Sequence, residues 1–510
     1  MKKNTIYSFI LLSLISLSTL GQSSLTLHTD QAETKINREI YGHFAEHLGR
    51  CIYGGIYVGE DSDIPNIRGF RLDVIGALKD MNIPLLRWPG GCFADTYNWK
   101  DGIGPKHKRP SMVNVHWGGV TEDNSFGTHE FLDFCELINA EPYINLNVGS
   151  GTVREAAEWV EYVTSANISP MTDLRKQNGR EEPWNVKYWG IGNENWGCGG
   201  NMTPEYYADL YNRFAGYCRG DLYRIAGGPN VDDYNWMEVL MQKTTRHRHL
   251  VQGVSLHNYT FTTGWTDKGS ATDFDEKGWI SVLDNTLRME TLIKRHSTIM
   301  DKYDPDKRIG LIVDEWGNWF NVEPGTNPGF LYQQNTLRDA MVAGINLNLF
   351  NNHADRVKMA NIAQTVNVLQ SVILTKEEQM VLTPTYYVFK MYSVHQDANL
   401  IPVNLKTGKY ELDGKSVPAV HASASTKDGQ VSITLCNLNP NKAESIDITL
   451  TGQDVSSASG QIVTAKNMND YNDFGQEEKV TLKSFDVKKP KDGKLTVEIP
   501  AKSVVLVQLK

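Results

Sequence analysis

Short apolar segments alternate with longer segments of helical periodicity between about residues 40 and 390. The short apolar runs predict buried strands, and apolar positions that recur every three or four residues predict the helices between them. The predicted strands cover residues 40–44, 84–88, 143–147, 186–191, 223–226, 254–258, 310–313 and 359–363. Eight repeated strand and helix units favour an α/β fold in which the strands form a parallel (β/α)8 TIM barrel.

Two of the predicted helices have recognisable first residues. Thr128 precedes an apolar stripe that ends at Ile138, and Thr203 followed by Pro204 precedes a second stripe that ends at Phe214. A threonine side chain accepts hydrogen bonds from the free N–H groups of a first turn, and proline fits the first helical position.

The period changes to two after about residue 395, in "QVSITLCNL", "SIDITL", "GKLTVEIP" and "SVVLVQL". Asp428-Gly429 and Asp492-Gly493 are typical of hairpin turns. We therefore predict an antiparallel β-sandwich, jelly-roll-like, at residues 393–510. The stretch "SSLTLHTD" is also strand-like, so residues 22–38 are predicted to add a strand to this sandwich, which leaves residues 39–392 for the barrel.

The N-terminus has the composition of a signal peptide. Lys2 and Lys3 precede an apolar run at residues 6–20, and small residues stand before Gln22. This pattern predicts cleavage after residue 21 and export to the periplasm or the medium. No later stretch approaches the roughly 18 apolar residues of a membrane span, so no membrane association is expected after processing.

The overall composition, with 40% hydrophobic and 22% charged residues among 510, is that of a soluble globular protein with two domains. A formal net charge of −9 offers no electrostatic footprint for nucleic acid and favours a neutral substrate. The spacing of the six cysteines, at positions 51, 92, 135, 198, 218 and 436, matches no metal or disulfide framework. Buried free thiols are the favoured interpretation, and their pairing stays open.

Polar side chains follow several predicted barrel strands, at the end where such barrels hold their active sites. They are Glu46, Arg87, Asn193, Glu194, His257, Tyr259, Asp314, Glu315 and Gln364. An ionised carboxylate is costly to bury without a partner, so several converging on one rim indicate acid–base chemistry. Glycoside hydrolysis needs one protonated and one ionised carboxyl group, and Glu194 and Glu315, after the fourth and seventh strands, can supply both.

A competing hypothesis comes from His43, Glu46 and His47, which form the pattern H-x-x-E-H of some zinc peptidases. Zinc ligands at this spacing need a helix, and a third protein ligand from elsewhere. The flanking Gly42 and Gly49 instead predict a short strand that runs into a glycine-rich loop. Hydrogen-bonded wall residues are therefore favoured over metal ligands, and a metal assay decides between them.

Six ordered segments then carry a resemblance to a known family. The segments "YGHFAEHLGRCIYGGI", "LRWPGGCFADTYNWKDGIGP", "GNENWG", "SLHNY", "VDEWGNWF" and "HADRVKMANIAQTVNV" resemble the motifs of the α-L-arabinofuranosidases of glycoside hydrolase family 51. The resemblance implies a retaining, exo-acting hydrolase that releases terminal α-L-arabinofuranosyl residues from arabinan- or arabinoxylan-type plant polysaccharides or oligosaccharides. It implies Glu194 as general acid/base, Glu315 as nucleophile, and no metal or organic cofactor.

The resemblance also implies a set of sugar-binding residues. Carried over position by position, they are Glu46, Arg87, Asn193, His257, Tyr259 and Gln364 around the ring, and Trp117 at the entrance. Glu46 is expected to accept hydrogen bonds from ring hydroxyls, Asn193 to contact the 2-hydroxyl, and Tyr259 to orient the nucleophile. Cys92 stands where some family members have asparagine, and because a thiol is a weak hydrogen-bond partner, that contact is either lost or differently arranged.

Two further alternatives remain: a related endo-β-1,4-glucanase with the same glutamates, and a non-catalytic carbohydrate-binding protein. The dense set of sugar-facing residues favours a pocket for one terminal sugar, and the presence of both glutamates argues against a non-catalytic protein. Loops such as residues 260–279 are expected to set specificity beyond the first sugar. A homo-oligomer is expected by analogy with the family alone.

Overall fold

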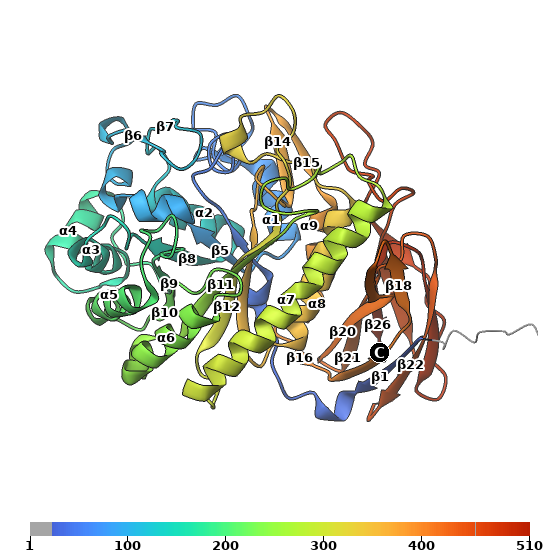
Figure 1. Ribbon diagram of the computed structural model, residues 1–510. Helices are drawn as coiled ribbons and strands as arrows, with labels where there is room; N and C mark the ends of the chain where they lie inside the picture. The colour runs from blue at the N-terminus through green and yellow to red at the C-terminus, as the bar shows by residue number, and fades with distance from the viewer. Residues whose placement is uncertain (1–22, 454) are drawn as a thin grey trace, which may run out of the picture.

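Eight parallel strands close into one barrel, and two further sheets form a sandwich beside it (Figure 1). The computed structural model describes residues 23–453 and 455–510. In order around the barrel the strands are β2 (Gly42–Phe44), β5 (Leu85–Trp88), β8 (Glu141–Leu146), β9 (Tyr188–Ile191), β10 (Tyr223–Ala226), β11 (Gly253–Thr260), β12 (Gly310–Asn318) and β13 (Val357–Ala363). Because β13 pairs back to β2, the predicted (β/α)8 fold is confirmed.

A helix follows each barrel strand and covers the outside of the sheet. In chain order these helices are α1 (Leu72–Asp80), α2 (Thr128–Ile138), α3 (Val153–Thr164), α5 (Pro204–Tyr217), α6 (Tyr234–Thr244), α7 (Glu276–Tyr303), α8 (Leu337–Asn352) and α9 (Pro384–Tyr392), with the short α4 (Pro170–Gln177) inserted after α3. Thr203 caps α5 as predicted, accepting from the backbone N–H of Tyr206 at 3.4 Å. Thr128 instead lies inside α2, where its hydroxyl accepts from the Trp159 indole at 3.1 Å.

Strands β11 and β12 extend beyond their predicted ends, and this extension shapes the site. His257 and Glu315 are direct neighbours across the two strands, and the pairing register shifts just before them. The register of β12 with β13 also shifts, between Val313 and Trp316. An irregularity of this kind redirects side chains locally, so Asp314 and Glu315 can both reach groups inside the barrel rim.

The C-terminal strands form two packed sheets around a separate apolar core. One sheet contains β17 (Val403–Lys406), β1 (Ser23–His28), β22 (Glu444–Thr451) and β25 (Lys494–Ile499); the other contains β16 (Asn399–Leu400), β20 (Val420–Lys427), β21 (Gln430–Asn437), β26 (Ser503–Leu509), β23 (Ala458–Val463) and β24 (Leu482–Phe485). Strand β1 pairs antiparallel with β17 and parallel with β22. We propose on this basis that residues 22–38 and 393–510 form one domain and residues 39–392 the other.

Helix α8 lies between the barrel and the sandwich (Figure 1) and is buried from Leu337 to Asn351. The side-chain oxygen of Asn348 accepts from Ser423 at 3.0 Å and from Thr434 at 2.7 Å, both in the sandwich. These bonds satisfy a polar side chain that would be costly to bury unpaired. The sandwich therefore supports the barrel behind β12, the strand that carries Asp314 and Glu315.

Small antiparallel pairs complete the described strands: β3 (Asn66–Ile67) with β4 (Phe70–Arg71), β6 (Met112–Val113) with β7 (Thr121–Glu122), β14 (Ile373–Lys376) with β15 (Gln379–Leu382), and β18 (Lys409–Leu412) with β19 (Lys415–Pro418). Among the residues that the structure describes, no helix combines the length and the apolar character needed to cross a membrane.

Candidate active site

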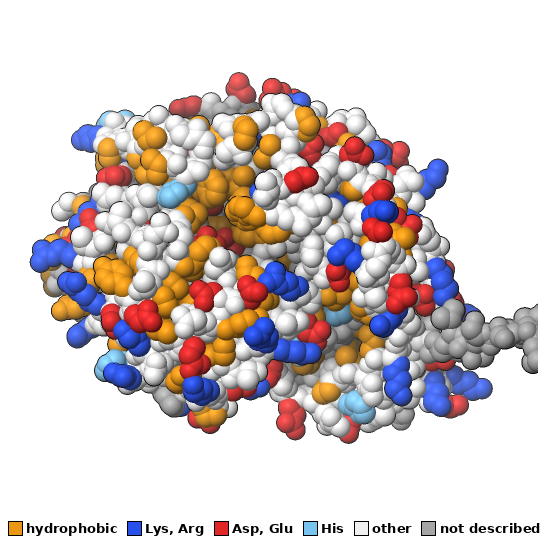
Figure 2. All heavy atoms as spheres, in the orientation of Figure 1, with side chains coloured by type: hydrophobic (Ala, Val, Ile, Leu, Met, Phe, Trp, Pro, Cys, Tyr) orange, Lys and Arg blue, Asp and Glu red, His pale blue; other side chains and the backbone are white. Residues whose placement is uncertain are grey.

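A cavity of about 890 Å³ opens at the carboxyl ends of the barrel strands. In the space-filling view, hydrophobic side chains gather around a hollow on the barrel half of the molecule (Figure 2). The predicted site residues that line the cavity are Glu46, Cys92, Trp117, Glu194, His257, Tyr259, Glu315 and Gln364. Arg87 and Asn193 are buried beside it and bonded to each other, Nη2 to Oδ1, at 2.7 Å. The strand-end residues predicted from the sequence thus converge on one place.

Glu315 is held at both carboxylate oxygens. Arg87 donates from Nη1 to Oε1 at 2.9 Å, and the Tyr259 hydroxyl donates to Oε2 at 2.8 Å. A charge-assisted bond from a guanidinium stabilises the ionised form of a carboxyl group. Glu315 is therefore an oriented carboxylate directed into the cavity.

Arg87 is itself fixed by a buried network. Its guanidinium also donates to the backbone oxygen of Asp314 at 3.0 Å and lies 4.4 Å from the centre of the Phe44 ring. Burial alone would lower the pKa of Arg87, but the charges of Asp314 and Glu315 raise it. Burial would likewise raise the pKa of the Asp314 carboxyl, yet Arg87 and His257 hold it below its usual value. The network thus keeps the charged guanidinium of Arg87 in contact with Glu315.

Glu194 lies on the turn after β9 in a different electrostatic setting. Its Oε1 lies 2.8 Å from Nδ1 of His257, whose Nε2 lies 3.2 Å from Oδ1 of Asp314. Burial would lower the pKa of His257, but the surrounding carboxylates raise it to about 10, so that both ring nitrogens carry protons at neutral pH. Burial raises the pKa of Glu194 above its ordinary value; the His257 hydrogen bond opposes this rise and the Glu315 charge adds to it.

The two glutamates are close enough to act on one bond. One oxygen of Glu194, one of Glu315 and a ring nitrogen of His257 all lie within 4.8 Å of one another. Retaining glycosidases hold their carboxyl groups about 5–5.5 Å apart, whereas inverting enzymes leave about 6.5–9.5 Å for a water molecule. A raised pKa on Glu194 beside an arginine-bound Glu315 is the acid and nucleophile pairing that retaining hydrolysis requires.

Glu46 closes the bottom of the cavity. Its Oε1 accepts from the backbone N–H groups of Gly91 at 2.9 Å and Phe93 at 3.1 Å, and its Oε2 accepts from Gln364 at 3.0 Å. Burial, with the Glu315 charge, raises its pKa to about 7. A Cβ at Gly90 would lie 2.6 Å from Cγ of Glu46, and a Cβ at Gly91 would lie 2.6 Å from Oε1 of Glu315, so both positions favour glycine. The end of the cavity is therefore narrow and polar.

Glu46→Gln is expected to lower kcat/KM for an arabinofuranoside about 10- to 100-fold, the range for losing a hydrogen bond to a charged acceptor. The fold should be unchanged, because the amide oxygen can still accept from Gly91 and Phe93. Steady-state kinetics with circular dichroism would measure both. Chelator treatment of the wild type is the counterpart: activity abolished by chelation and restored by zinc would make the H-x-x-E-H motif a metal site.

The H-x-x-E-H residues do not converge in the structure. The ring of His43 lies in the core, 4.7 Å from that of Phe389, and His47 accepts from the Trp88 indole at 3.1 Å. Over residues 23–453 and 455–510, neither histidine belongs to a group of side chains close enough to share an ion. The motif begins on strand β2, as its flanking glycines predicted, and not on a helix.

The structure corrects one prediction about the cysteines. Cys92 and Cys198 form a disulfide across 106 residues of sequence, so neither is a free thiol. The turns after β5 and β9 bring them together, and sequence spacing does not report this contact. The prediction of buried free thiols is confirmed for the other four, Cys51, Cys135, Cys218 and Cys436.

Two supporting residues were missed by the sequence analysis. Tyr143 on β8 donates to Oδ2 of Asp314 at 2.7 Å. Asp95, after β5, accepts from the backbone N–H of Val148 at 2.8 Å and of Asn193 at 3.1 Å. Burial raises the pKa of Asp95 to about 7. Its position just after a barrel strand was the available signal for Asp95.

The segments after β11 and β12 form a wall of the cavity. Phe261 and Trp265 follow β11 and Trp319 follows β12, and the ring centres of Trp265 and Trp319 are 5.1 Å apart. The Lys268 ammonium lies 4.7 Å from the Trp265 ring. Trp265 remains 63% exposed, so this wall presents an aromatic face to whatever extends beyond the buried end of the cavity.

Comparison with known proteins shows which family models and relatives this chain matches. Residues 77–260 match the "Alpha-L-arabinofuranosidase 1 domain", and residues 314–503 match the "Alpha-L-arabinofuranosidase C-terminal domain". The chain is 54% identical over 503 residues to an "Intracellular exo-alpha-L-arabinofuranosidase" from Bacteroides ovatus, covering 97% of each protein.

Solved structures of arabinofuranosidases also match this chain. The crystal structure of the GH51 arabinofuranosidase from Xanthomonas axonopodis pv. citri matches with a TM-score of 0.94 and 48% identity, covering 96% of this chain and 100% of that one. The arabinose complex of the α-L-arabinofuranosidase from Thermotoga maritima matches with a TM-score of 0.82 and 30% identity, covering 96% and 99%.

The prediction of export is contradicted by these comparisons, because the Bacteroides ovatus relative is named an intracellular enzyme. The prediction rested on residues 1–21, which lie outside the described residues. Its basis was the two lysines, the apolar run and the small residues before Gln22, and such a pattern does not by itself establish the compartment.

Proposed function

Because this chain belongs to the α-L-arabinofuranosidases of glycoside hydrolase family 51, we propose that Glu315 is its nucleophile and Glu194 its general acid/base. The enzyme is a retaining, exo-acting glycosidase that releases terminal α-L-arabinofuranosyl residues. The observation that supports the two roles best is the contrast between the neighbouring carboxyl groups: the pKa of Glu194 is raised, and Glu315 accepts from Arg87.

In the first step the ionised carboxylate of Glu315 attacks the anomeric carbon while Glu194 protonates the departing oxygen. Arg87 and Tyr259 each hold one oxygen of Glu315, so the nucleophile enters the reaction already oriented. The His257 imidazolium occupies Oε1 of Glu194, which leaves Oε2 to carry the transferred proton. The products are a covalent arabinosyl-enzyme and the free leaving group.

In the second step Glu194, now ionised, removes a proton from water, and the water attacks the same carbon. Two inversions give net retention of configuration. Both carboxyl groups return to their starting protonation states, with Glu194 protonated and Glu315 ionised. Asp314 and Tyr143 take no direct part. Asp314 contacts both His257 and Arg87 and holds them in place, and Tyr143 donates to Asp314.

Exo action is supported by the buried part of the cavity wall, where Glu46 is 2% and Gln364 is 1% exposed and the two side chains are hydrogen-bonded to each other. We propose that the terminal sugar binds there, with Asn193 toward its 2-hydroxyl, and that the rest of an arabinan- or arabinoxylan-type chain extends past Trp117 and Trp265. Neither an endo-glucanase nor a non-catalytic binding protein is favoured by these observations.

A panel of 4-nitrophenyl glycosides tests the proposal. We expect kcat/KM for the α-L-arabinofuranoside to be at least about 100-fold higher than for the β-xyloside, β-glucoside or β-cellobioside. A site rejects a sugar strongly when the hydroxyls of that sugar leave the buried polar groups of the site unpaired. Cellobioside hydrolysis above that of the arabinofuranoside would favour the glucanase alternative. No hydrolysis of any substrate would favour a binding protein.

A further inference from the structure

The turn that carries Glu194 has a backbone conformation that must be held from outside. Glu194 has φ of +42°, in the left-handed region that residues other than glycine adopt at a cost. Its backbone oxygen accepts from the N–H groups of Gly197 at 2.7 Å and Gly199 at 3.2 Å. Such a residue stays in place only when neighbouring groups fix the chain on both sides of it.

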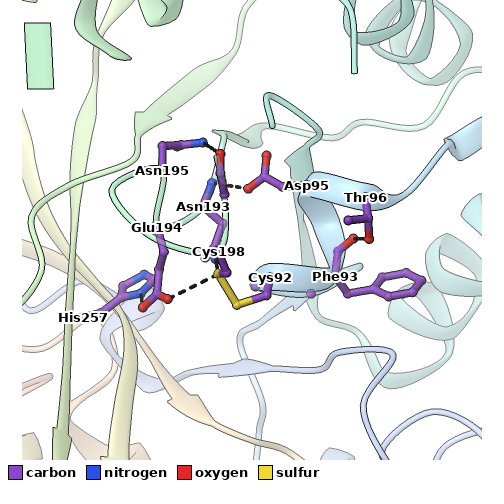
Figure 3. The surroundings of a disulfide bond; sticks show 12 residues. Cys92, Phe93, Asp95, Thr96, Asn193, Glu194, Asn195, Cys198 and His257 are labelled. Atoms are coloured by element: carbon purple, nitrogen blue, oxygen red, sulfur yellow. Dashed lines mark hydrogen bonds and ion pairs between the residues drawn. A yellow bond between two sulfur atoms is a disulfide. The ribbon is translucent and has the colours of Figure 1, made fainter. Parts of the chain in front are cut away.

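Two attachments flank Glu194, and both come from the short helix η3 (Cys92–Thr96) after β5. On one side Oδ2 of Asp95 accepts from the backbone N–H of Asn193 at 3.1 Å. On the other side Cys198 is covalently bonded to Cys92, with their Cα atoms 5.5 Å apart. Figure 3 shows Glu194 between these two attachments, with its carboxyl group turned toward His257 and the disulfide.

The disulfide also touches the carboxyl group itself. Sγ of Cys198 lies 3.5 Å from Oε2 of Glu194, while Oε1 is occupied by His257. A disulfide sulfur carries no proton, so it cannot donate to Oε2. A thiol at the same position would be a donor and would compete for the oxygen that has to carry the catalytic proton.

We propose that the Cys92–Cys198 disulfide is a positioning element for Glu194, and that its reduction by a small thiol impairs general acid catalysis. The proposal rests on the role of Glu194 proposed above. Both cysteines line the cavity and are partly exposed, so a small thiol entering the cavity can reach them. The other four cysteines are buried and free.

The reduction step is thiol–disulfide exchange. A thiolate of a small dithiol attacks one protein sulfur and breaks the S–S bond, and the second thiol of the reagent then displaces the mixed disulfide. Two electrons and two protons pass from the dithiol to the protein. Cys92 and Cys198 each end as a thiol, and the reagent ends as a cyclic disulfide.

The test measures kcat/KM of the full-length enzyme before and after dithiothreitol, on two arabinofuranosides that differ in leaving group. For a methyl arabinofuranoside, which needs protonation, we expect about a 10-fold loss, smaller than the roughly 10²- to 10⁴-fold that removing a general acid costs, because Glu194 is displaced and not removed. For the 4-nitrophenyl arabinofuranoside, whose leaving group departs without a proton, we expect less than about a twofold change in kcat/KM. Oxidised glutathione should restore the starting values.

A pH profile gives a second readout. The charged groups facing Glu194 are His257 on β11, Glu315 on β12 and Arg87 on β5, and reduction changes none of them. A new thiol that donates to the ionised carboxylate favours its ionised form. The alkaline limb of kcat/KM for the methyl arabinofuranoside should therefore move to lower pH in the reduced enzyme.

The double variant Cys92→Ser/Cys198→Ser should reproduce the reduced enzyme and be insensitive to dithiothreitol, whereas Cys135→Ala, on α2, should respond as the wild type does.

A lower melting temperature without change in leaving-group dependence or pH profile would make the disulfide purely structural and overturn the proposal. So would full reduction, shown by thiol counting, without any effect. If the double variant does not fold, the reduced wild type decides alone. Failure of the oxidised wild type to cleave either substrate would instead contradict the proposed function.

Discussion

Glu315→Ala is expected to lose about 10⁴-fold or more in kcat/KM on every arabinofuranoside, whatever its leaving group, because no covalent intermediate can form without the nucleophile. Arg87 and Tyr259, which each hold one oxygen of Glu315, would keep their places but have nothing to orient. Steady-state kinetics on the 4-nitrophenyl and methyl arabinofuranosides measures the loss.

The matched control is Glu136→Ala, which removes the same charge from helix α2, where Glu136 pairs with Arg180 on the barrel exterior. Its kinetics should stay within about twofold of the wild type, as expected for an exposed ion pair. Azide added to the Glu315 variant should yield only the arabinosyl azide of inverted configuration. Activity retained by the Glu315 variant would refute the assignment of the nucleophile.

Glu194→Ala is expected to separate substrates by leaving group. The methyl arabinofuranoside should lose about 10²- to 10⁴-fold in kcat/KM, the usual contribution of a positioned acid, and the 4-nitrophenyl arabinofuranoside should lose much less. Because the pKa of Glu194 is raised above its ordinary value, wild-type kcat/KM should fall as pH rises through that pKa and the acid loses its proton. This alkaline limb should be absent in the variant.

Azide supplies the control for Glu194→Ala. An anion that needs no general base can attack the arabinosyl-enzyme, so azide should accelerate turnover of the 4-nitrophenyl substrate and give an azide product of retained configuration. Equal losses on both substrates, without rescue, would mean that Glu194 supports the fold of the site and does not transfer a proton.

The barrel and both catalytic candidates could be predicted because each depends on local pattern. Strand positions follow from short apolar runs, and a residue at a strand end is placed at the rim by the fold itself. The place of Glu194 and Glu315 at the rim needed nothing more, whereas their separate roles came from the family resemblance. Even the longer β12 left Glu315 at the rim, since the parallel sheet fixes which ends of the strands meet.

The residues that hold the glutamates could not be predicted in the same way. Cys92 and Cys198 are 106 residues apart, and their contact depends on the shapes of two irregular turns whose strands, β5 and β9, are separated by β8. Asp95 accepts from the backbone N–H of Asn193, and because almost every residue carries a backbone donor, such a partner leaves no trace in the side-chain pattern. Arg87 was predicted as a sugar ligand, but its guanidinium is bonded beneath Glu315 and Asn193.

The most direct test of the account is the stereochemical course followed by proton NMR during hydrolysis of an aryl α-L-arabinofuranoside. The close approach of Glu194 and Glu315 predicts that the first arabinose released has the α configuration, with the β anomer appearing only later through mutarotation. Release of β-arabinose first would mean inversion through a water molecule, and would contradict both the covalent intermediate and the assignment of Glu315 as the nucleophile.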